Sequence, residues 1–228
     1  MTLLEAIYAR HSVRIFRPYP LAPETVSMLE AKIAEVNREG NLHIQLILNE
    51  PKAFQGILAY GKFSGVSDYL VMIGHKAPDL DERIGYYGEQ LVLYAQTLGL
   101  NTCWAGLSYQ KIPNTFVLEE GEKVACYIAI GYGFFEGNTH KIKTVQQVSN
   151  ADSSTPEWFV RGVEAALLAP TAVNQQKFSF RYLGLQDGHH VVEAKRGFSM
   201  IGYTHMDLGI AKCHFEIAAG KENFQWKE

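Results

Sequence analysis

Residues 82–98, ERIGYYGEQLVLYAQTL, form the longest stretch with a helical pattern in this chain of 228 residues. Its apolar residues recur at the spacing of one helix face, and they are Ile84, Leu91, Tyr94, Ala95 and Leu98. Gly99 follows as a stop, because glycine readily takes the left-handed conformation that ends helices. The stretch is therefore expected to form a long core helix.

Shorter elements surround this stretch. Thr2 and Glu5 form a capping box that predicts a helix over 3–10, and Thr155 followed by Pro156 predicts the start of a helix that ends at Ala169. Further helices are expected before Gly40 and over 204–219, where Gly220 is the stop. The predicted strands cover 42–48, 69–73, 123–130, 178–183 and 190–194. Helices and short strands mix without regular βαβ alternation, which indicates an α+β fold.

Composition excludes several classes of protein. The net charge of −3 gives no indication of binding to nucleic acid or to an acidic membrane surface. No apolar run approaches the roughly 20 residues that cross a bilayer, and the N-terminus lacks the basic start of a secretory signal. Three widely spaced cysteines fit reduced thiols without a disulfide framework or a zinc knuckle. A cytoplasmic protein is expected.

Two basic segments are candidates for binding phosphate. The first is Arg10-His11-Ser12-Val13-Arg14, where a helix gives way to an extended segment. Arginine presents a planar fork of donors that suits phosphate oxygens. The second is Lys141-Ile142-Lys143, whose two lysines share one face if the segment is extended. Each segment taken alone also fits ordinary surface charge.

Two other segments are suited to a planar heterocyclic ligand. In Ala169–Phe178 a helix breaks at Pro170, and amide side chains follow that can pair with the polar edge of a ring. In Gly99–Gly106 the small residues Ala105 and Gly106 let the backbone approach a ligand closely. The alternative for Ala169–Phe178 is a loop with ordinary turn residues. The alternative for Gly99–Gly106 is a helix end followed by a strand.

Together the four segments resemble the FMN-dependent nitroreductase family. The resemblance implies a mixed sheet flanked by helices and one FMN site. It assigns phosphate and ribityl contacts to the first basic segment and to the two lysines, and it places Lys62 near the flavin ring. Carried over position by position, the cofactor-binding residues are Arg10, His11, Ser12, Arg14, Lys62, Ala105, Gly106, Lys141, Lys143, Pro170, Thr171, Ala172, Asn174 and Gln176. Lys177-Phe178 departs from the proline-tryptophan often found in the family, which puts the shape of the substrate pocket in doubt.

The order of the motifs is unusual for that family, because the alanine-proline segment comes after the basic pair. This order resembles a subgroup in which one chain imitates the nitroreductase dimer. It implies two pseudo-symmetric halves, 1–148 gripping the phosphate and 156–228 completing the site, in a monomer that is open to further self-association. Similar apolar stretches at 87–95 and 206–219 are expected to be the paired core helices of the two halves.

The residues themselves provide no catalytic side-chain set. The pair His189-His190 is expected in a turn after Gly188. There is no Gly-x-Ser-x-Gly elbow, the eight histidines show no metal-ligand spacing, and Gly131-x-Gly133 lacks the third glycine of a dinucleotide fingerprint. This absence agrees with a flavoenzyme, in which the cofactor performs the chemistry. The resemblance implies hydride transfer from NAD(P)H to a small-molecule acceptor such as a nitroaromatic or quinone, with ping-pong kinetics. The alternatives are a flavin-binding store or sensor without turnover, and a structural protein that has lost its ligand.

Overall fold

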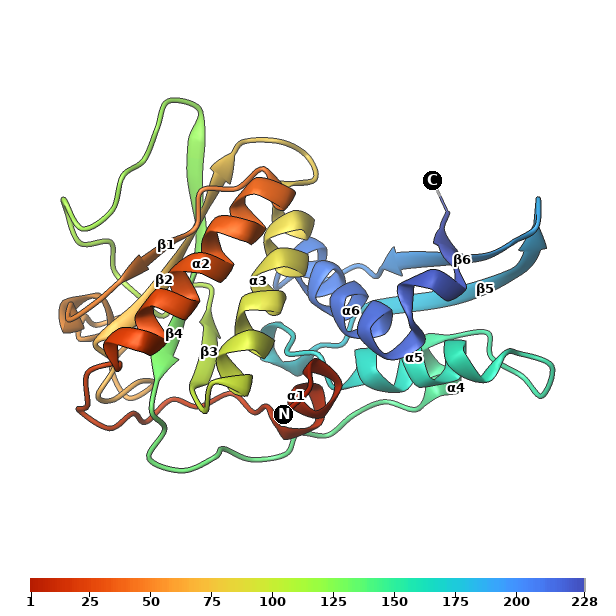
Figure 1. Ribbon diagram of the computed structural model, residues 1–228, viewed down its shortest axis with the longest axis horizontal. Helices are drawn as coiled ribbons and strands as arrows, with labels where there is room; N and C mark the ends of the chain where they lie inside the picture. Colours follow the sequence, from red (N-terminus) through yellow and green to blue (C-terminus); the bar gives the residue numbers. More distant parts are fainter. Residues whose placement is uncertain (228) are drawn as a thin grey trace.

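The computed structural model describes residues 1–227, which form six α-helices and seven strands (Figure 1). The helices are α1 (Leu3–Ala9), α2 (Pro23–Gly40), α3 (Leu80–Thr97), α4 (Val145–Val148), α5 (Glu157–Leu167) and α6 (Thr204–Ala219). The strands are β1 (Gln45–Ile47), β2 (Asp68–His75), β3 (Asn101–Ala105), β4 (Glu122–Gly131), β5 (Phe178–Gln186), β6 (His189–Arg196) and β7 (Gln225–Trp226). Short 3-10 helices cover Pro51–Phe54, Ala172–Asn174 and Lys221–Asn223. The predicted α+β class is confirmed.

The first sheet has the strand order β1-β2-β4-β3, with every neighbouring pair antiparallel. Both faces of its central strand β2 are buried. Leu70 and Met72 belong to the same core cluster as residues of α2 and α3, which cover one face of the sheet (Figure 1). Tyr69 and Val71 belong to a second cluster on the other face, together with residues of loops. Burial on both sides explains why residues 69–73 are a continuous apolar run.

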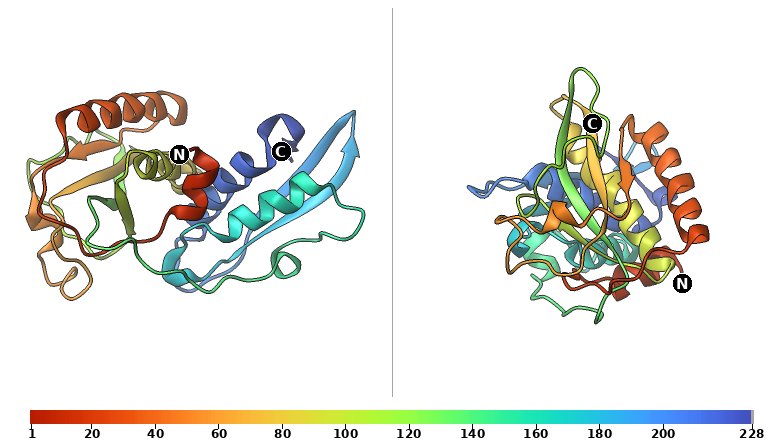
Figure 2. Two further views of the ribbon diagram at one scale, coloured as in Figure 1. Left: turned by 60° about the horizontal axis from the view of Figure 1, so that its bottom comes forward. Right: turned by 90° about the vertical axis from the view of Figure 1, so that its left-hand side faces the viewer.

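The second sheet contains β5, β6 and β7, with β5 antiparallel and β7 parallel to β6. Helix α5 precedes the hairpin formed by β5 and β6, and helix α6 follows it. The order helix, strand, strand, helix therefore occurs twice along the chain, as α2-β1-β2-α3 and as α5-β5-β6-α6. Figure 2 shows the two groups of elements side by side, and the segment that leads from β4 to α4 runs along both of them.

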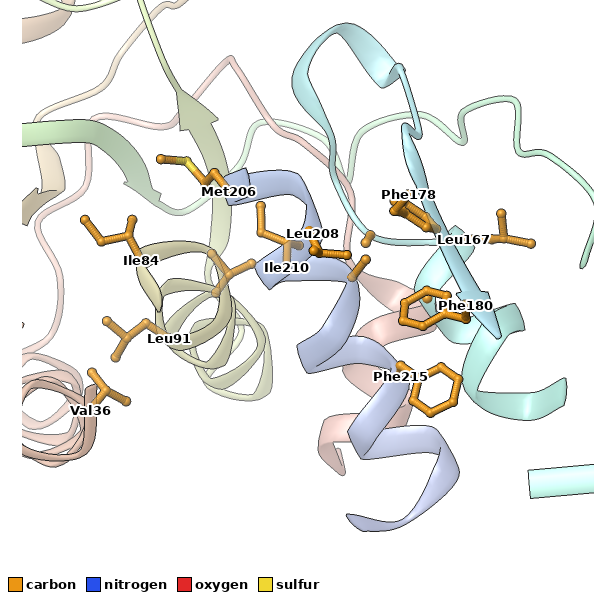
Figure 3. Packing of buried hydrophobic residues seen from close by; sticks show 14 of the residues in the cluster. Val36, Ile84, Leu91, Leu167, Phe178, Phe180, Met206, Leu208, Ile210 and Phe215 are labelled. Carbon is orange, nitrogen blue, oxygen red and sulfur yellow. The ribbon is translucent and has the colours of Figure 1, made fainter. Parts of the chain in front are cut away.

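Helices α3 and α6 cross where each carries a glycine. A Cβ atom on Gly85 would lie 2.1 Å from the carbonyl oxygen of Met206, and one on Gly209 would lie 2.0 Å from the carbonyl oxygen of Glu82. The two backbones therefore touch, and only hydrogen fits between them. Figure 3 shows Met206 and Ile210 on the side of α6 near Ile84, with Phe215 beside Phe180. One continuous core joins the two groups of elements.

Three local predictions are corrected by the structure. Pro156 is the N-cap residue of α5 rather than its first helical residue, and the Thr155 side chain does not cap the helix. Instead, the Thr155 hydroxyl accepts from the Asp152 amide in the preceding turn at 3.0 Å. Strand β1 covers only Gln45–Ile47 of the predicted 42–48. The His189-His190 pair begins β6, because the turn consists of Asp187 and Gly188, both with positive φ.

Over the described residues, no helix has both the length and the apolar character needed to cross a bilayer. Cys103, Cys126 and Cys213 are all buried and form no disulfide. Their burial places the three thiols in the cores of the two groups of elements, where they behave as small apolar side chains.

Candidate functional site

A pocket of about 600 Å³ lies between β3, the segment after α1, the loop after α5 and the start of α6. Its volume is typical of sites for small molecules and cofactors. Eight of the residues predicted from the sequence line it: Ser12, Arg14, Lys62, Ala105, Gly106, Pro170, Thr171 and Ala172. These residues come from four separate segments of the chain, and the fold brings them together.

The segment after α1 directs two polar side chains into this pocket. Residues 12–16 run as an extended strand-like segment, in which Val13 N donates to Thr102 O at 3.0 Å and Phe16 N donates to Ser64 O at 2.9 Å. Val13 is fully buried in the core. Because side chains alternate along an extended chain, Ser12 and Arg14 point the opposite way, toward the pocket.

One end of the pocket is basic. Ser12, Arg14 and Lys62 also line an adjoining hollow of about 430 Å³, which adds Asn138 and His140. The Nε2 atom of His140 is buried without a hydrogen-bond partner. Burial lowers the pKa of His140, and the nearby positive charge of Arg10 acts in the same direction. This end therefore offers the two cations Arg14 and Lys62 together with the Ser12 hydroxyl, a combination suited to an anion.

The loop after α5 forms another wall and has a constrained backbone. Val173, Asn174 and Gln176 all have positive φ, at 46°, 56° and 45°. Such a conformation is rare for a β-branched residue, and Val173 is also 74% exposed. Strained backbone of this kind clusters at binding sites, where the surrounding structure holds it in place.

Contacts with the basic pair hold this loop in position. The side-chain amide nitrogens of Asn174 and Gln176 each donate to Lys141 O at 2.8 Å. Lys143 N donates to the Gln176 side chain at 2.9 Å, and Lys143 Nζ donates to Gln176 O at 2.6 Å. Two motifs that are far apart in sequence thus meet, but through contacts with each other. None of these four residues is on the pocket lining.

Asp207, in the first turn of α6, also holds the loop after α5, through hydrogen bonds on the side opposite the 141–143 segment. Its side chain is on the pocket lining, and the residue is 3% exposed. Ala172 N donates to its Oδ1 at 3.0 Å, and the Gln175 amide donates to its Oδ2 at 2.7 Å. Burial raises the pKa of Asp207 to about 6, against the opposing effect of these hydrogen bonds.

Arg10 has different surroundings from Arg14. It is 4% exposed, and its Nε lies 3.8 Å from Oε1 of Glu89, which is fully buried. Glu89 also accepts from Trp104 Nε1 at 2.9 Å, and its Oε1 lies 2.9 Å from His214 Nε2. Arg10 is not on the pocket lining, and neither is His11, which lies beside Gly137. Arg10 therefore compensates a buried carboxylate in this structure.

Replacing Asp207 by asparagine is expected to change how stability depends on pH. The pKa of Asp207 in the folded chain, about 6, lies above its ordinary value of 3.8, so the folded state binds this proton more tightly. Its contribution favours folding at low pH and is lost as the pH rises through 6. Relative to Asp207→Asn, the wild type should lose about 2 kcal/mol of stability between pH 4.5 and pH 7.

The measurement is urea denaturation of the ligand-free proteins at both pH values, with the exposed Asp187→Asn as the matched control. A stability difference between wild type and Asp207→Asn that is the same at pH 4.5 and pH 7 would contradict the prediction. The variant should also bind the pocket's ligand more weakly, because asparagine offers one acceptor oxygen where Asp207 offers two, one to Ala172 N and one to the Gln175 amide.

Several lining residues were not predicted from the sequence. Tyr203, Met206, Asp207 and Ile210 come from the start of α6, and Asn138 and His140 come from the loop after β4. Tyr203 is held in the left-handed conformation at φ 61°, and a Cβ on Gly106 would lie 2.7 Å from its ring. The one signal in the sequence was a carboxylate in the first turn of a mostly apolar helix, because a buried carboxylate needs partners.

The arrangement suits a flat heterocycle with an anionic tail. The wider part of the pocket is mostly apolar, with exposed backbone at the 105–106 and 170–172 segments, and the other end carries Arg14 and Lys62. A separate hollow of about 680 Å³ lies beside Pro18 and Gly65, and no charged residue is among the described residues that line it. That hollow lacks the groups that would bind an anionic tail.

Comparisons with known proteins agree with this architecture. The family model described as "Putative TM nitroreductase" matches residues 2–219. A crystal structure of a "putative nitroreductase" from Thermotoga maritima is 23% identical, with a TM-score of 0.65 over 97% of this chain and 85% of that one. A "putative nitroreductase in complex with FMN" from Desulfovibrio desulfuricans is 16% identical, with a TM-score of 0.52 over 68% of this chain and 99% of that one. No curated protein matches the sequence.

Proposed function

The chain belongs to the family described as "Putative TM nitroreductase", and from this membership and the pocket's geometry we propose that it is an FMN-dependent oxidoreductase. It passes hydride from NAD(P)H to a nitroaromatic, quinone or similar acceptor by a ping-pong mechanism. The observation that carries the proposal is the gathering of Ser12, Arg14 and Lys62 with the 105–106 and 170–172 backbone around one pocket.

The residues present fit FMN. Arg14 and Lys62 would bind the phosphate with Ser12 as a further donor, which puts Lys62 at the phosphate end rather than near the flavin ring, where the resemblance places it. The flavin ring would lie against Ala105 and Gly106, where the absence of a side chain on Gly106 leaves backbone accessible and gives room to Tyr203. Bound FMN supplies the redox chemistry, namely accepting a hydride and passing electrons on.

The protein's own part is to orient the ligands and to supply positive charge. The 170–176 loop, held by Asp207 on one side and by the 141–143 segment on the other, keeps the backbone of Thr171 and Ala172 at the edge of the pocket. Arg14 and Lys62 place positive charge at one end, where it favours an anionic ligand. Lys141, Lys143, Asn174 and Gln176 contribute by holding the loop, and Arg10 contributes by neutralising Glu89.

One chain imitates the two-chain site of a dimer in this proposal. The halves are 1–148, which provides the phosphate end, and 156–228, which provides the 170–176 loop and α6. The repeated order of elements and the reciprocal contacts of Gly85 and Gly209 across α3 and α6 support this reading. The proposal implies one flavin per chain in a cytoplasmic monomer, with further self-association open.

The test is an absorbance spectrum of the protein purified with added FMN, followed by anaerobic titration with NADPH and NADH. Bound flavin that is bleached by one of the donors would support the oxidoreductase and identify the donor. Bound flavin that stays oxidised would favour a store or sensor instead. Failure to bind FMN would overturn the site, and steady-state kinetics that require a ternary complex would overturn the ping-pong mechanism.

A further inference from the structure

We propose that the far end of the first sheet carries a binding site for a divalent metal ion such as Zn²⁺, formed by His75, Glu119 and Glu122. One ligand atom from each side chain lies within 4.8 Å of the other two. None of the three residues lines the FMN pocket, so the site is independent of the proposed oxidoreductase activity.

Regular backbone positions these three side chains. His75 is the last residue of β2 and Glu122 is the first residue of β4, and the antiparallel register places them directly opposite each other. Directly opposed residues project to the same face of a sheet. Glu119 belongs to the turn that leads into β4, where its backbone N donates to Glu122 Oε2 at 2.8 Å. Figure 1 shows the end of β2 beside the beginning of β4.

A hydrogen-bonded chain behind Glu122 orients its carboxylate. The Gln45 amide is fixed by Val117, whose N donates to Gln45 Oε1 at 2.9 Å and whose O accepts from Gln45 Nε2 at 2.7 Å. Gln45 Nε2 also lies 3.2 Å from Nε2 of His43, which must therefore be the acceptor. The proton of the neutral His43 ring is then on Nδ1, which lies 3.1 and 3.0 Å from the two oxygens of Glu122.

This arrangement is the one expected around a metal-binding carboxylate. Carboxylate ligands of metal ions are usually oriented by hydrogen bonds from a second layer of residues, and here that layer is His43, Gln45 and Val117. Glu122 is 6% exposed, whereas His75 and Glu119 are exposed and free to adjust. Oε2 of Glu122 accepts from both His43 Nδ1 and Glu119 N, whereas Oε1 has only its contact with His43 Nδ1 and keeps a lone pair for a metal ion.

The negative charges of Glu119 and Glu122 also favour the binding of a cation. Two carboxylates lie side by side, and in residues 1–227 neither has a lysine or arginine nitrogen within the 4.0 Å of a salt bridge. Carboxylates this close repel each other unless a positive charge or a proton lies between them. A divalent ion bound to both would replace that repulsion with attraction and would join β2, β4 and the turn that leads into β4.

The ligand types favour Zn²⁺ over Ca²⁺ or Mg²⁺. Calcium and magnesium prefer all-oxygen sites, whereas zinc binds imidazole nitrogen together with carboxylate oxygen at about 2.0–2.2 Å. Three protein ligands leave one position of a tetrahedral ion for water. No local motif indicates this site, because His75 is far from Glu119 and Glu122 along the chain and is brought to them by the register of β2 and β4.

The test is isothermal titration calorimetry of the EDTA-treated full chain with ZnCl₂. We expect one Zn²⁺ per chain, and His75→Ala and Glu119→Gln should each weaken binding at least tenfold. The matched controls are Glu120→Gln, the same change one residue along, and His189→Ala, an exposed histidine at another strand end. Both controls should bind Zn²⁺ as the wild type does.

Two results would overturn the proposal. One is wild-type protein that binds no Zn²⁺, and the other is His75→Ala and Glu119→Gln proteins that bind it unchanged, because the ion would then be held by other histidines. Circular dichroism would show that the variants are folded, which is expected because both side chains are exposed. FMN binding should be the same in all of these proteins, so the outcome is separate from that of the flavin experiment.

Discussion

Gly209→Ala is expected to lower the free energy of unfolding by about 3 kcal/mol, although alanine is the better helix former. Helix propensity alone would favour alanine by about 1 kcal/mol. The new methyl group, however, would lie 2.0 Å from Glu82 O and 2.8 Å from Tyr86 N, which are backbone atoms that cannot rotate away. Because ordinary C···O contacts are about 3.3–3.6 Å, α3 and α6 must separate by more than 1 Å and loosen the core between them.

Urea denaturation followed by circular dichroism measures this effect, and Gly197→Ala is the matched control. A Cβ on Gly197 would meet its neighbours at 3.4 Å or more, which is ordinary contact, so that variant should be about as stable as the wild type. A Gly209→Ala protein with wild-type stability would contradict the close crossing of α3 and α6.

Gly85→Ala provides a second test of the same crossing. Its methyl group would lie 2.1 Å from Met206 O, so it should cost about as much as Gly209→Ala. The double variant is expected to cost clearly less than the sum of the two, because one separation of the helices relieves both overlaps. Fully additive effects would mean that the two glycines act independently. Either variant should also weaken FMN binding, since Met206, Asp207 and Ile210 line the pocket.

The elements that were predicted well from the sequence are those with strong local signals. The capping box at Thr2, the stops at Gly99 and Gly220 and the apolar run at 69–73 all correspond to observed elements, whereas α2 includes Gly40 and ends at the left-handed Asn41. The start of α5 was misplaced because Thr155 bonds within the preceding turn, in competition with capping. The His189-His190 pair was misplaced because Asp187 and Gly188 alone complete the hairpin turn.

In the candidate site, too, residues placed by local patterns were predicted better than residues placed by tertiary contacts. Ser12 and Arg14 reach the pocket as expected, because alternation along an extended segment is a local property. Arg10 does not line the pocket, because it pairs with Glu89 instead. Glu89 and its partner His214 approach each other only when α3 and α6 pack together. Tyr203 and Asp207 were not predicted for a related reason. Their roles arise from contacts with Gly106 and with the 172–175 loop, which no local pattern in α6 indicates.

Arg14→Gln is expected to raise the Kd for FMN by about tenfold to hundredfold and to leave the protein folded. Arg14 is exposed on the lining of the pocket, and the described structure assigns it no ion pair of its own. A hydrogen bond from a charged donor contributes about 1.5–3 kcal/mol, and each 1.4 kcal/mol is tenfold in affinity. Flavin fluorescence quenching measures the Kd. Arg161→Gln is the control, because Arg161 forms only an exposed pair with Glu157 on α5.

Riboflavin, which lacks the phosphate, shows whether the lost affinity belongs to that group. Arg14→Gln should weaken FMN binding but leave riboflavin binding unchanged, so that the variant distinguishes the two ligands less strongly than the wild type does. Equal losses for both would place Arg14 elsewhere than at the phosphate. Arg10→Gln should behave differently, with a loss of about 3–5 kcal/mol of stability, because Glu89 would remain buried without its cation. If Arg10→Gln instead weakened FMN binding alone, its guanidinium would have to leave Glu89 and reach the phosphate in the complex.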